Sequence, residues 1–304
     1  MALDWGELLT VENKDVESVF VNHEIHPVNN KLHCRGYTLP FTGTQQRTKK
    51  LMKLLSQQLE HYVFPEAEKD DYDWPDARDK FGDNDPESDG KLGEMLLYIM
   101  VEAFLQTPMI AYKLKDLSNP NDQVKGADGV FVGEYSGRKA LLIGESKIHN
   151  SLTGAISSAI ESLHRFHESE KAYDHEICIC RKYPKERELS AELLQEALDI
   201  LNDEVERIIV HPVFISYDYD SILKISTDAE DAKSAEFLLK DQIKKEVKRW
   251  QKLILKKKDK FPSAFKVYLD FFFLPVEDCL KLRNDFYRKL HGCEYKPPLK
   301  SKKR

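Results

Sequence analysis

An aspartate, a glutamate and a lysine are spaced so that one β-hairpin could bring them together: Asp128, Glu145 and Lys147. They belong to two stretches, 128–135 and 139–147, whose apolar residues and flanking turn residues predict β-strands. Side chains alternate between the two faces of a strand, so Glu145 and Lys147 share one face. A hairpin built from these strands would place two carboxylates and one amine at the same end.

The register of this hairpin follows from its turn. Ser136-Gly137 is a turn dipeptide between the two strands. A two-residue turn there pairs Tyr135 with Arg138 and, counting outwards, Asp128 with Glu145. Opposed carboxylates repel each other unless a cation or a shared proton compensates. The pattern therefore predicts a divalent cation beside them.

Mg²⁺ is the expected cation, because it prefers oxygen ligands and leaves positions open for water and substrate phosphate. We expect Mn²⁺ to substitute for it. Lys147 could orient or help deprotonate a metal-bound water, or stabilise charge on the phosphate. The predicted chemistry is hydrolysis of a phosphodiester. The alternative is an exposed hairpin whose charges are simply solvated. This alternative is less favoured, because the stretch 140–144 between these charges and the turn is apolar.

The elements around the hairpin predict an α/β protein with a mixed central sheet flanked by helices. Helical periodicity marks 45–59 and the segment that starts at Leu152, and 93–105 is apolar on nearly every side, as in a buried helix. Glu94 lies near the start of that buried helix. A carboxylate there either interacts favourably with the positive end of the helix dipole or takes part in the site of the charged hairpin. Further strands are predicted at 176–180, 207–216 and 265–274.

Three regions follow from the composition. Residues 1–90 form an N-terminal region with an amphipathic helix and an acidic loop, 91–220 the core with the charged hairpin, and 221–304 a helix and strand region with a basic tail. Within 60–90, 12 acidic residues stand against 3 basic ones, with interspersed prolines. This composition predicts a solvated connector without regular structure. Shielding of a basic cleft is a second interpretation of it.

Composition also excludes several classes. The 304 residues are 41% hydrophobic and 32% charged, which argues against global disorder, and the formal net charge of −6 argues against a generally basic nucleic-acid coat. No apolar run approaches the roughly 20 residues of a membrane span, so we expect a cytoplasmic protein without membrane contact. Five scattered cysteines predict reduced thiols. A phosphate-binding loop for ATP is absent from the sequence.

One local stretch is strongly basic. Residues 240–260 carry 10 Lys or Arg and 3 acidic residues on a predicted amphipathic helix. Lys256, Lys257 and Lys258 are candidates for DNA phosphate contacts, and a solvated helix face is an equally good interpretation. His23, His26, His33 and Cys34 lie near one another in sequence but lack the fixed spacing of a zinc site, so surface or capping roles are favoured.

The motifs together resemble a known superfamily. Glu94 in a helix, then Gly126-Ala127-Asp128-Gly129, then Gly144-Glu145-Ser146-Lys147, then a helix from Leu152, resemble the PD-(D/E)xK nuclease core. The combination of the two glycine-flanked motifs is similar to the HamA family, the nuclease subunits of the bacterial Hachiman anti-phage system. The sequence departs from the superfamily at Ala127, where the name has Pro, and lacks a Gln-x-x-x-Tyr signature after Lys147.

The resemblance implies a Mg²⁺-dependent deoxyribonuclease of antiviral defence, restrained by a partner helicase, HamB. It implies that Asp128 and Glu145 bind metal, that Lys147 is the catalytic lysine, and that Glu94 contacts metal directly or through water. Two alternatives stay open. One is a sequence-specific restriction endonuclease, and the other is a catalytically silent module that docks a helicase or clamps DNA.

Overall fold

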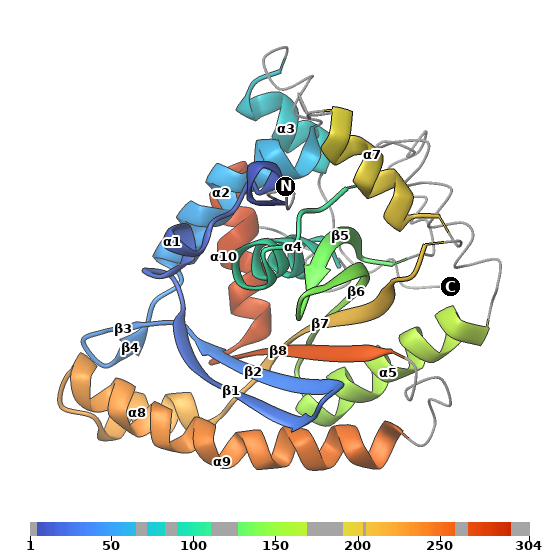
Figure 1. The fold of residues 1–304 in the computed structure, drawn as a ribbon. Coiled ribbons are helices and arrows are strands. Elements are labelled where there is room, and N and C mark those ends of the chain that lie inside the picture. The colour runs from blue at the N-terminus through green and yellow to red at the C-terminus, as the bar shows by residue number, and fades with distance from the viewer. Residues whose placement is uncertain are drawn as a thin grey trace, which may run out of the picture.

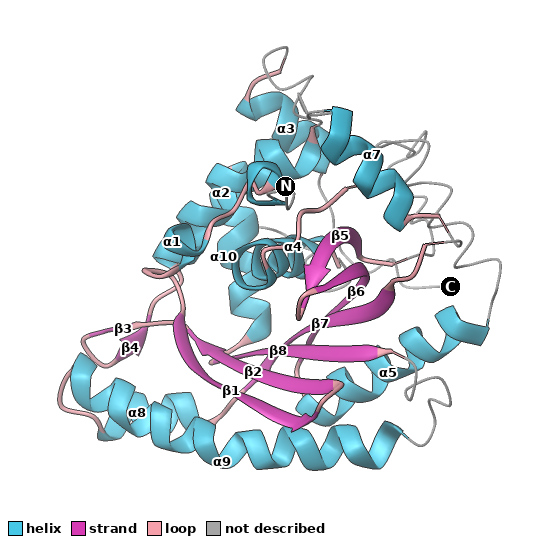
Figure 2. Ribbon diagram, in the orientation of Figure 1, coloured by secondary structure: helices cyan, strands magenta, loops and turns pink. Residues whose placement is uncertain are grey.

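A computed structural model describes residues 5–64, 72–82, 90–110, 127–168, 191–202, 205–258 and 267–292. Its centre is a six-stranded sheet enclosed by helices on both faces (Figures 1 and 2). The predicted α/β class with a mixed, helix-flanked sheet is confirmed.

The sheet has the strand order β1-β2-β8-β7-β6-β5. The four central strands β2, β8, β7 and β6 run parallel to one another, and β1 and β5 pair antiparallel at the two edges. The strands are β1 (Val21–Asn29), β2 (Leu32–Thr38), β5 (Gly129–Tyr135), β6 (Arg138–His149), β7 (Ile208–Asp218) and β8 (Tyr268–Val276). The carboxyl ends of the four parallel strands therefore share one edge of the sheet, the edge at which ligands usually bind in such folds.

Two layers of helices cover the sheet. One layer consists of α2 (Lys49–Val63), α4 (Lys91–Leu105) and α10 (Cys279–His291), and the other of α5 (Leu152–Glu168), α8 (Ser221–Asp228) and α9 (Ala232–Lys258) (Figure 1). Next to β5 lies α7 (Ala191–Ile200). The short elements are η1 (Trp5–Leu8), α1 (Asn13–Val16), β3 (Phe41–Thr42), β4 (Gln45–Gln46) and α3 (Trp74–Phe81).

Strand alternation explains the two cores. On β8, Phe272 and Leu274 pack with the α2, α4 and α10 layer, whereas Phe271 and Phe273 pack with the α5, α8 and α9 layer. A parallel strand with helices on both faces must be apolar on both faces, which is why this stretch reads as a continuous hydrophobic run. The indole of Trp250 on α9 stacks on Phe273 with ring centroids 4.2 Å apart.

The buried helix predicted at 93–105 is α4, and its second acidic residue has a structural role. Glu102 is fully buried, and its carboxylate accepts hydrogen bonds from the Thr10 hydroxyl at 2.6 Å and from the backbone N–H groups of Thr10 at 2.7 Å, Val11 at 3.1 Å and Met109 at 3.0 Å. These bonds tie the chain before α1 and the chain after α4 to the helix. Buried carboxylates need such partners.

Some predictions need correction. The helix expected at 45–59 begins at Lys49, because Gln45–Gln46 pairs with Phe41–Thr42 as a small hairpin, and it continues to Val63. The acidic segment 60–90 is not a connector without regular structure: it contains the end of α2 and all of α3. The composition hides α3 because only two of its residues, Ala77 and Phe81, are buried, and Asp73 caps it through the Asp76 N–H. The strand predicted at 176–180 lies outside the described residues.

The sheet takes strands from all three regions that the composition suggested, β1 and β2 from the first, β5 to β7 from the second and β8 from the third. Within the described residues, no helix has the length and apolar character needed to cross a bilayer.

Candidate active site

The charged hairpin forms with the predicted turn and register. β5 and β6 pair from Tyr135 opposite Arg138 to Gly129 opposite Gly144. The ladder does not continue to Asp128, because the Asp128 N–H donates to the Gly144 carbonyl at 2.9 Å. If the register set by the turn continued, Asp128 would face Glu145 directly. Asp128 lies beside Glu145 instead.

The Asp128 carboxylate is held by the residue between the two other site residues. Its Oδ2 accepts a hydrogen bond from the Ser146 backbone N–H at 2.7 Å and a second from the Ser146 hydroxyl at 2.8 Å. The Ser146 N–H lies beyond the last residue pair between β5 and β6, so β5 offers it no backbone partner. The Asp128 carboxylate accepts its hydrogen bond in place of that strand. Both bonds orient the carboxylate at the end of the hairpin.

Glu145 and Lys147 lie on the α5 side of β6. Glu145 is 7% exposed, and the Lys147 ammonium forms an ion pair with its Oε1. The pKa of Glu145 is raised from 4.5 to about 7, mainly because the carboxyl is buried and also because of the negative charge of Asp128. The ammonium of Lys147 and a hydrogen bond with Ser162 on α5 lower that pKa. Glu145 thus lies where ionisation is costly, and a positive charge beside it offsets the cost.

Glu94 reaches the same region from the other layer. It lies in the first turn of α4, half-buried, and the Tyr62 hydroxyl of α2 donates to its Oε2 at 3.4 Å. The neighbouring Gly93 sits directly on Ser146: a Cβ at Gly93 would lie 2.9 Å from the Ser146 Oγ. The first turn of α4 is therefore pressed against the residue that holds Asp128.

The predicted residues are brought together unequally. Asp128, Glu145 and Lys147 share the end of one hairpin, whereas Glu94 approaches from α4 and is connected to them through the contact of Gly93 with Ser146. Within the described residues, no group of three or more His, Cys, Asp or Glu is close enough to hold a metal ion.

The donor set nevertheless fits a hard divalent cation. Asp128 and Glu145 supply two carboxylates close enough for one charge to raise the pKa of the other, and a cation would relieve that repulsion. Mg²⁺ commonly takes one or two protein carboxylates and fills its remaining positions with water and phosphate.

The other sequence candidates lie elsewhere. Lys256 and Lys257 are on the last turn of α9, exposed and half-buried respectively, and of Lys258 only the backbone is described. His23 is buried against the Thr38 hydroxyl, and burial lowers its pKa to about 4. The Asp270 carboxylate ion-pairs with Arg35 at 2.7 Å and lies 3.8 Å from His33. The expected surface or capping roles are wrong for His23 and Cys34, which are buried within β1 and β2.

Three contributors escaped the sequence interpretation. Ser146 stands inside the motif, and its position between Glu145 and Lys147 is the only signal that could have drawn attention to it. Ser162 and Tyr62 come from α5 and α2, and their contacts with Glu145 and Glu94 depend on helix packing. The spacing of residues along the sequence does not predict these contacts.

The chain matches a known protein family. A family model described as HamA matches residues 14–290. The matched range runs from α1 through α10 and so covers the whole sheet and the charged hairpin. No curated protein matches the chain.

Proposed function

The chain belongs to the HamA family of Hachiman antiviral-defence proteins, and from this premise we propose that it is a metal-dependent nuclease that hydrolyses DNA phosphodiesters. The observation that carries the proposal is the Glu145–Lys147 ion pair beside Asp128 at the end of the β5–β6 hairpin. Two carboxylates and an amine at one strand end suit phosphodiester hydrolysis with a metal ion.

Asp128 and Glu145 are the residues that would hold Mg²⁺ or Mn²⁺, with Glu94 contributing through water. The metal, when bound, supplies a water of lowered pKa and neutralises charge on the phosphate. The chain's own contribution is orientation. Ser146 fixes the Asp128 carboxylate with two hydrogen bonds, and Ser162 and Lys147 favour the ionised form of Glu145 that a metal needs.

Lys147 has a second role in this proposal. Its ammonium is adjacent to Glu145 and would stabilise negative charge on the substrate phosphate once a metal shares that carboxylate. The same ammonium can orient an attacking water by a hydrogen bond at Nζ. Loss of the amine should therefore lower cleavage more than it lowers metal binding.

We propose that DNA is the substrate and that a partner helicase restrains the nuclease and releases it. The resemblance to the HamA family implies that this helicase is HamB. The absence of an ATP-binding loop from the sequence supports a separate motor. A nuclease that is active without restraint would damage the host, which is a reason for such a partner.

The test is cleavage of linear and supercoiled DNA with Mg²⁺ or Mn²⁺, with and without the helicase and ATP. We expect Glu145→Ala and Lys147→Ala to abolish cleavage. Glu134→Ala is the matched control, because Glu134 is exposed near the turn of the same hairpin. Equal cleavage by wild type and Glu145→Ala would refute the assignment.

The same assay separates the alternatives. Fragments with discrete ends from unrelated plasmids would indicate a sequence-specific restriction endonuclease. Phage protection that survives in Glu145→Ala would indicate a catalytically silent module that docks a helicase or clamps DNA.

A further inference from the structure

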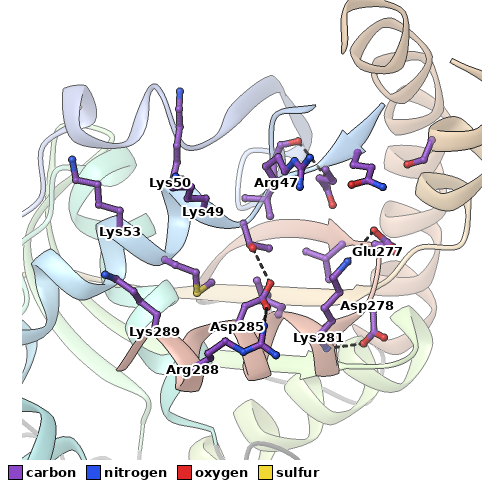
Figure 3. A pocket seen from close by; sticks show the side chains of 18 of the residues that line it. Arg47, Lys49, Lys50, Lys53, Glu277, Asp278, Lys281, Asp285, Arg288 and Lys289 are labelled. Atoms are coloured by element: carbon purple, nitrogen blue, oxygen red, sulfur yellow. Dashed lines mark hydrogen bonds and ion pairs between the residues drawn. The ribbon is translucent and has the colours of Figure 1, made fainter. Parts of the chain in front are cut away.

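A basic groove lies at the carboxyl edge of the sheet, and its lining residues come from elements other than the charged hairpin. Its volume is about 960 Å³, and its walls are the β3–β4 hairpin, the first turns of α2, one side of α10 and part of α8 (Figure 3). The cationic residues that line it are Arg47, Lys49, Lys50, Lys53, Lys281, Arg288 and Lys289. Its carboxylates are Glu277, Asp278 and Asp285.

The three carboxylates are already engaged within the protein. Asp285 accepts a hydrogen bond from the Thr48 hydroxyl at 2.8 Å and lies 3.8 Å from the Arg288 guanidinium. Asp278 caps α10 through the Lys281 N–H at 2.9 Å, and Glu277 lies 3.7 Å from the Lys281 ammonium. Each of these carboxylates thus already has a hydrogen-bond or ion-pair partner within the protein.

Five of the cations lack such partners. Among the described residues, no ion pair joins a carboxylate to the exposed side chains of Arg47, Lys49, Lys50, Lys53 or Lys289. The first turn of α2 also has no acidic residue, so its lysines face the positive end of the helix dipole. Like charges gathered at an unfavourable helix end cost stability, and a polyanion in the groove would offset that cost.

The lining also indicates which part of a nucleic acid the groove suits. Among the described residues that line it, the uncharged side chains are aliphatic, sulfur-containing or polar, and none is aromatic: Leu39, Met52, Leu223, Ser226, Val276 and Leu282 are examples. Binding of unpaired bases usually uses aromatic platforms, whereas lysines and arginines contact phosphates regardless of sequence.

Two elements connect the groove to the candidate active site. α2 lines the groove at Lys53 and contacts Glu94 through Tyr62, nine residues later and so about 14 Å along the helix. α10 lines the groove with one side, and with another its Arg283 donates to the Ile148 carbonyl of β6 at 2.9 Å. The length of about 14 Å along α2 between Lys53 and Tyr62 corresponds to about four base pairs of duplex DNA.

We propose that this groove binds the phosphate backbone of duplex DNA and holds the substrate on its way to the hairpin. The inference rests on the proposed function, because it says where the DNA of that reaction lies. It differs from the basic end of α9, whose lysines the sequence suggested. In Figure 3, Lys53 on α2 and Lys289 on α10 lie on the same side of the groove, and both would contact phosphate.

The experiment measures binding of a labelled 30-base-pair duplex of mixed sequence to the full chain in EDTA, over a range of salt concentrations. We expect Lys53→Gln/Lys289→Gln to bind about tenfold more weakly at low salt and to reduce the slope of log Kd against log salt by about 2. Lys14→Gln/Lys233→Gln removes the same charge from exposed positions outside the groove and should leave both values unchanged. Thermal unfolding of each variant checks that the fold is intact.

Two comparisons keep the failure of this inference distinct from failure of the proposed function. Binding is measured in EDTA, so a loss of duplex binding in Lys53→Gln/Lys289→Gln supports the groove whether or not any form of the protein cleaves DNA. A salt slope that falls only in Lys256→Gln/Lys257→Gln/Lys258→Gln would place the contact on α9 and overturn the groove assignment. The groove assignment would also be overturned if the wild-type chain did not bind duplex. The same holds if a groove variant lost binding of polyglutamate but not of duplex.

Discussion

Ser146 donates two hydrogen bonds to a single oxygen of Asp128, one from its backbone and one from its side chain. Because strand side chains alternate, Ser146 points toward α4 while its neighbours Glu145 and Lys147 point toward α5. The motif therefore uses both faces of β6: the outer residues supply charge, and the central one positions the aspartate.

Ser146→Ala tests this positioning role. The backbone bond to Asp128 remains and the hydroxyl bond is lost, so we expect about tenfold slower cleavage and a stability loss of about 1 kcal/mol. Nuclease assays and urea unfolding measure the two effects. A raised metal concentration for half-maximal activity would identify the loss as misplacement of Asp128. Wild-type activity in the variant would contradict the role.

Gly93→Ala tests the contact between α4 and the hairpin. The new Cβ would lie 2.9 Å from the Ser146 Oγ and 3.3 Å from its Cβ, so helix and strand must separate. We expect a stability loss of about 1 to 3 kcal/mol together with reduced cleavage. Gly90→Ala is the matched control one turn earlier, where the nearest atom would be Glu94 Oε1 at 3.6 Å. Equal stability of the two variants in thermal unfolding would contradict the close contact.

The raised pKa of Glu145 predicts a dependence of stability on pH. A folded-state pKa of about 7 against 4.5 unfolded means that the folded chain favours the protonated form. The resulting stability is fully present below pH 4.5 and is lost as pH rises through about 7, by up to about 3 kcal/mol. Glu145→Gln cannot ionise and should lack this loss. Urea unfolding in EDTA from pH 4.5 to 8 compares the two profiles, and parallel profiles would contradict the raised pKa.

Divalent metal should reverse that loss, because metal and proton compete for the Glu145 carboxylate. We expect Mg²⁺ to raise the unfolding temperature of the wild type more at pH 8 than at pH 5.5, and to have little effect on Glu145→Gln at either pH. Differential scanning fluorimetry with 10 mM EDTA as the reference measures the shift. An equal shift in wild type and variant would indicate that metal binds elsewhere.

Glu102→Gln tests the buried carboxylate of α4. Its Oε2 accepts three hydrogen bonds and its Oε1 a fourth, from the Met109 N–H. An amide offers one acceptor oxygen and would set its NH₂ group against the remaining N–H, so we expect a loss of about 2 to 4 kcal/mol. Metal binding at the hairpin should stay unchanged, since Glu102 contacts the chain segments at 10–11 and 109. Urea unfolding measures the effect.

Local patterns in the sequence were sufficient for much of this protein. The turn at Ser136-Gly137 and the alternation on either side predicted the hairpin and its register as far as Gly129, and the all-round apolar 93–105 predicted the buried helix. Such features depend on neighbours within one strand or helix, where the spacing of side chains fixes which face they share.

Tertiary structure alone decided the rest. The sequence could not reveal that Ser162 and Tyr62 contact the site residues Glu145 and Glu94, or that Asp128 leaves the strand ladder to meet Ser146. The basic groove is likewise divided between α2 and α10, more than 200 residues apart, so no window of sequence shows its charge. Side chains from distant segments meet only when the helices pack on the sheet, and packing depends on the whole core at once.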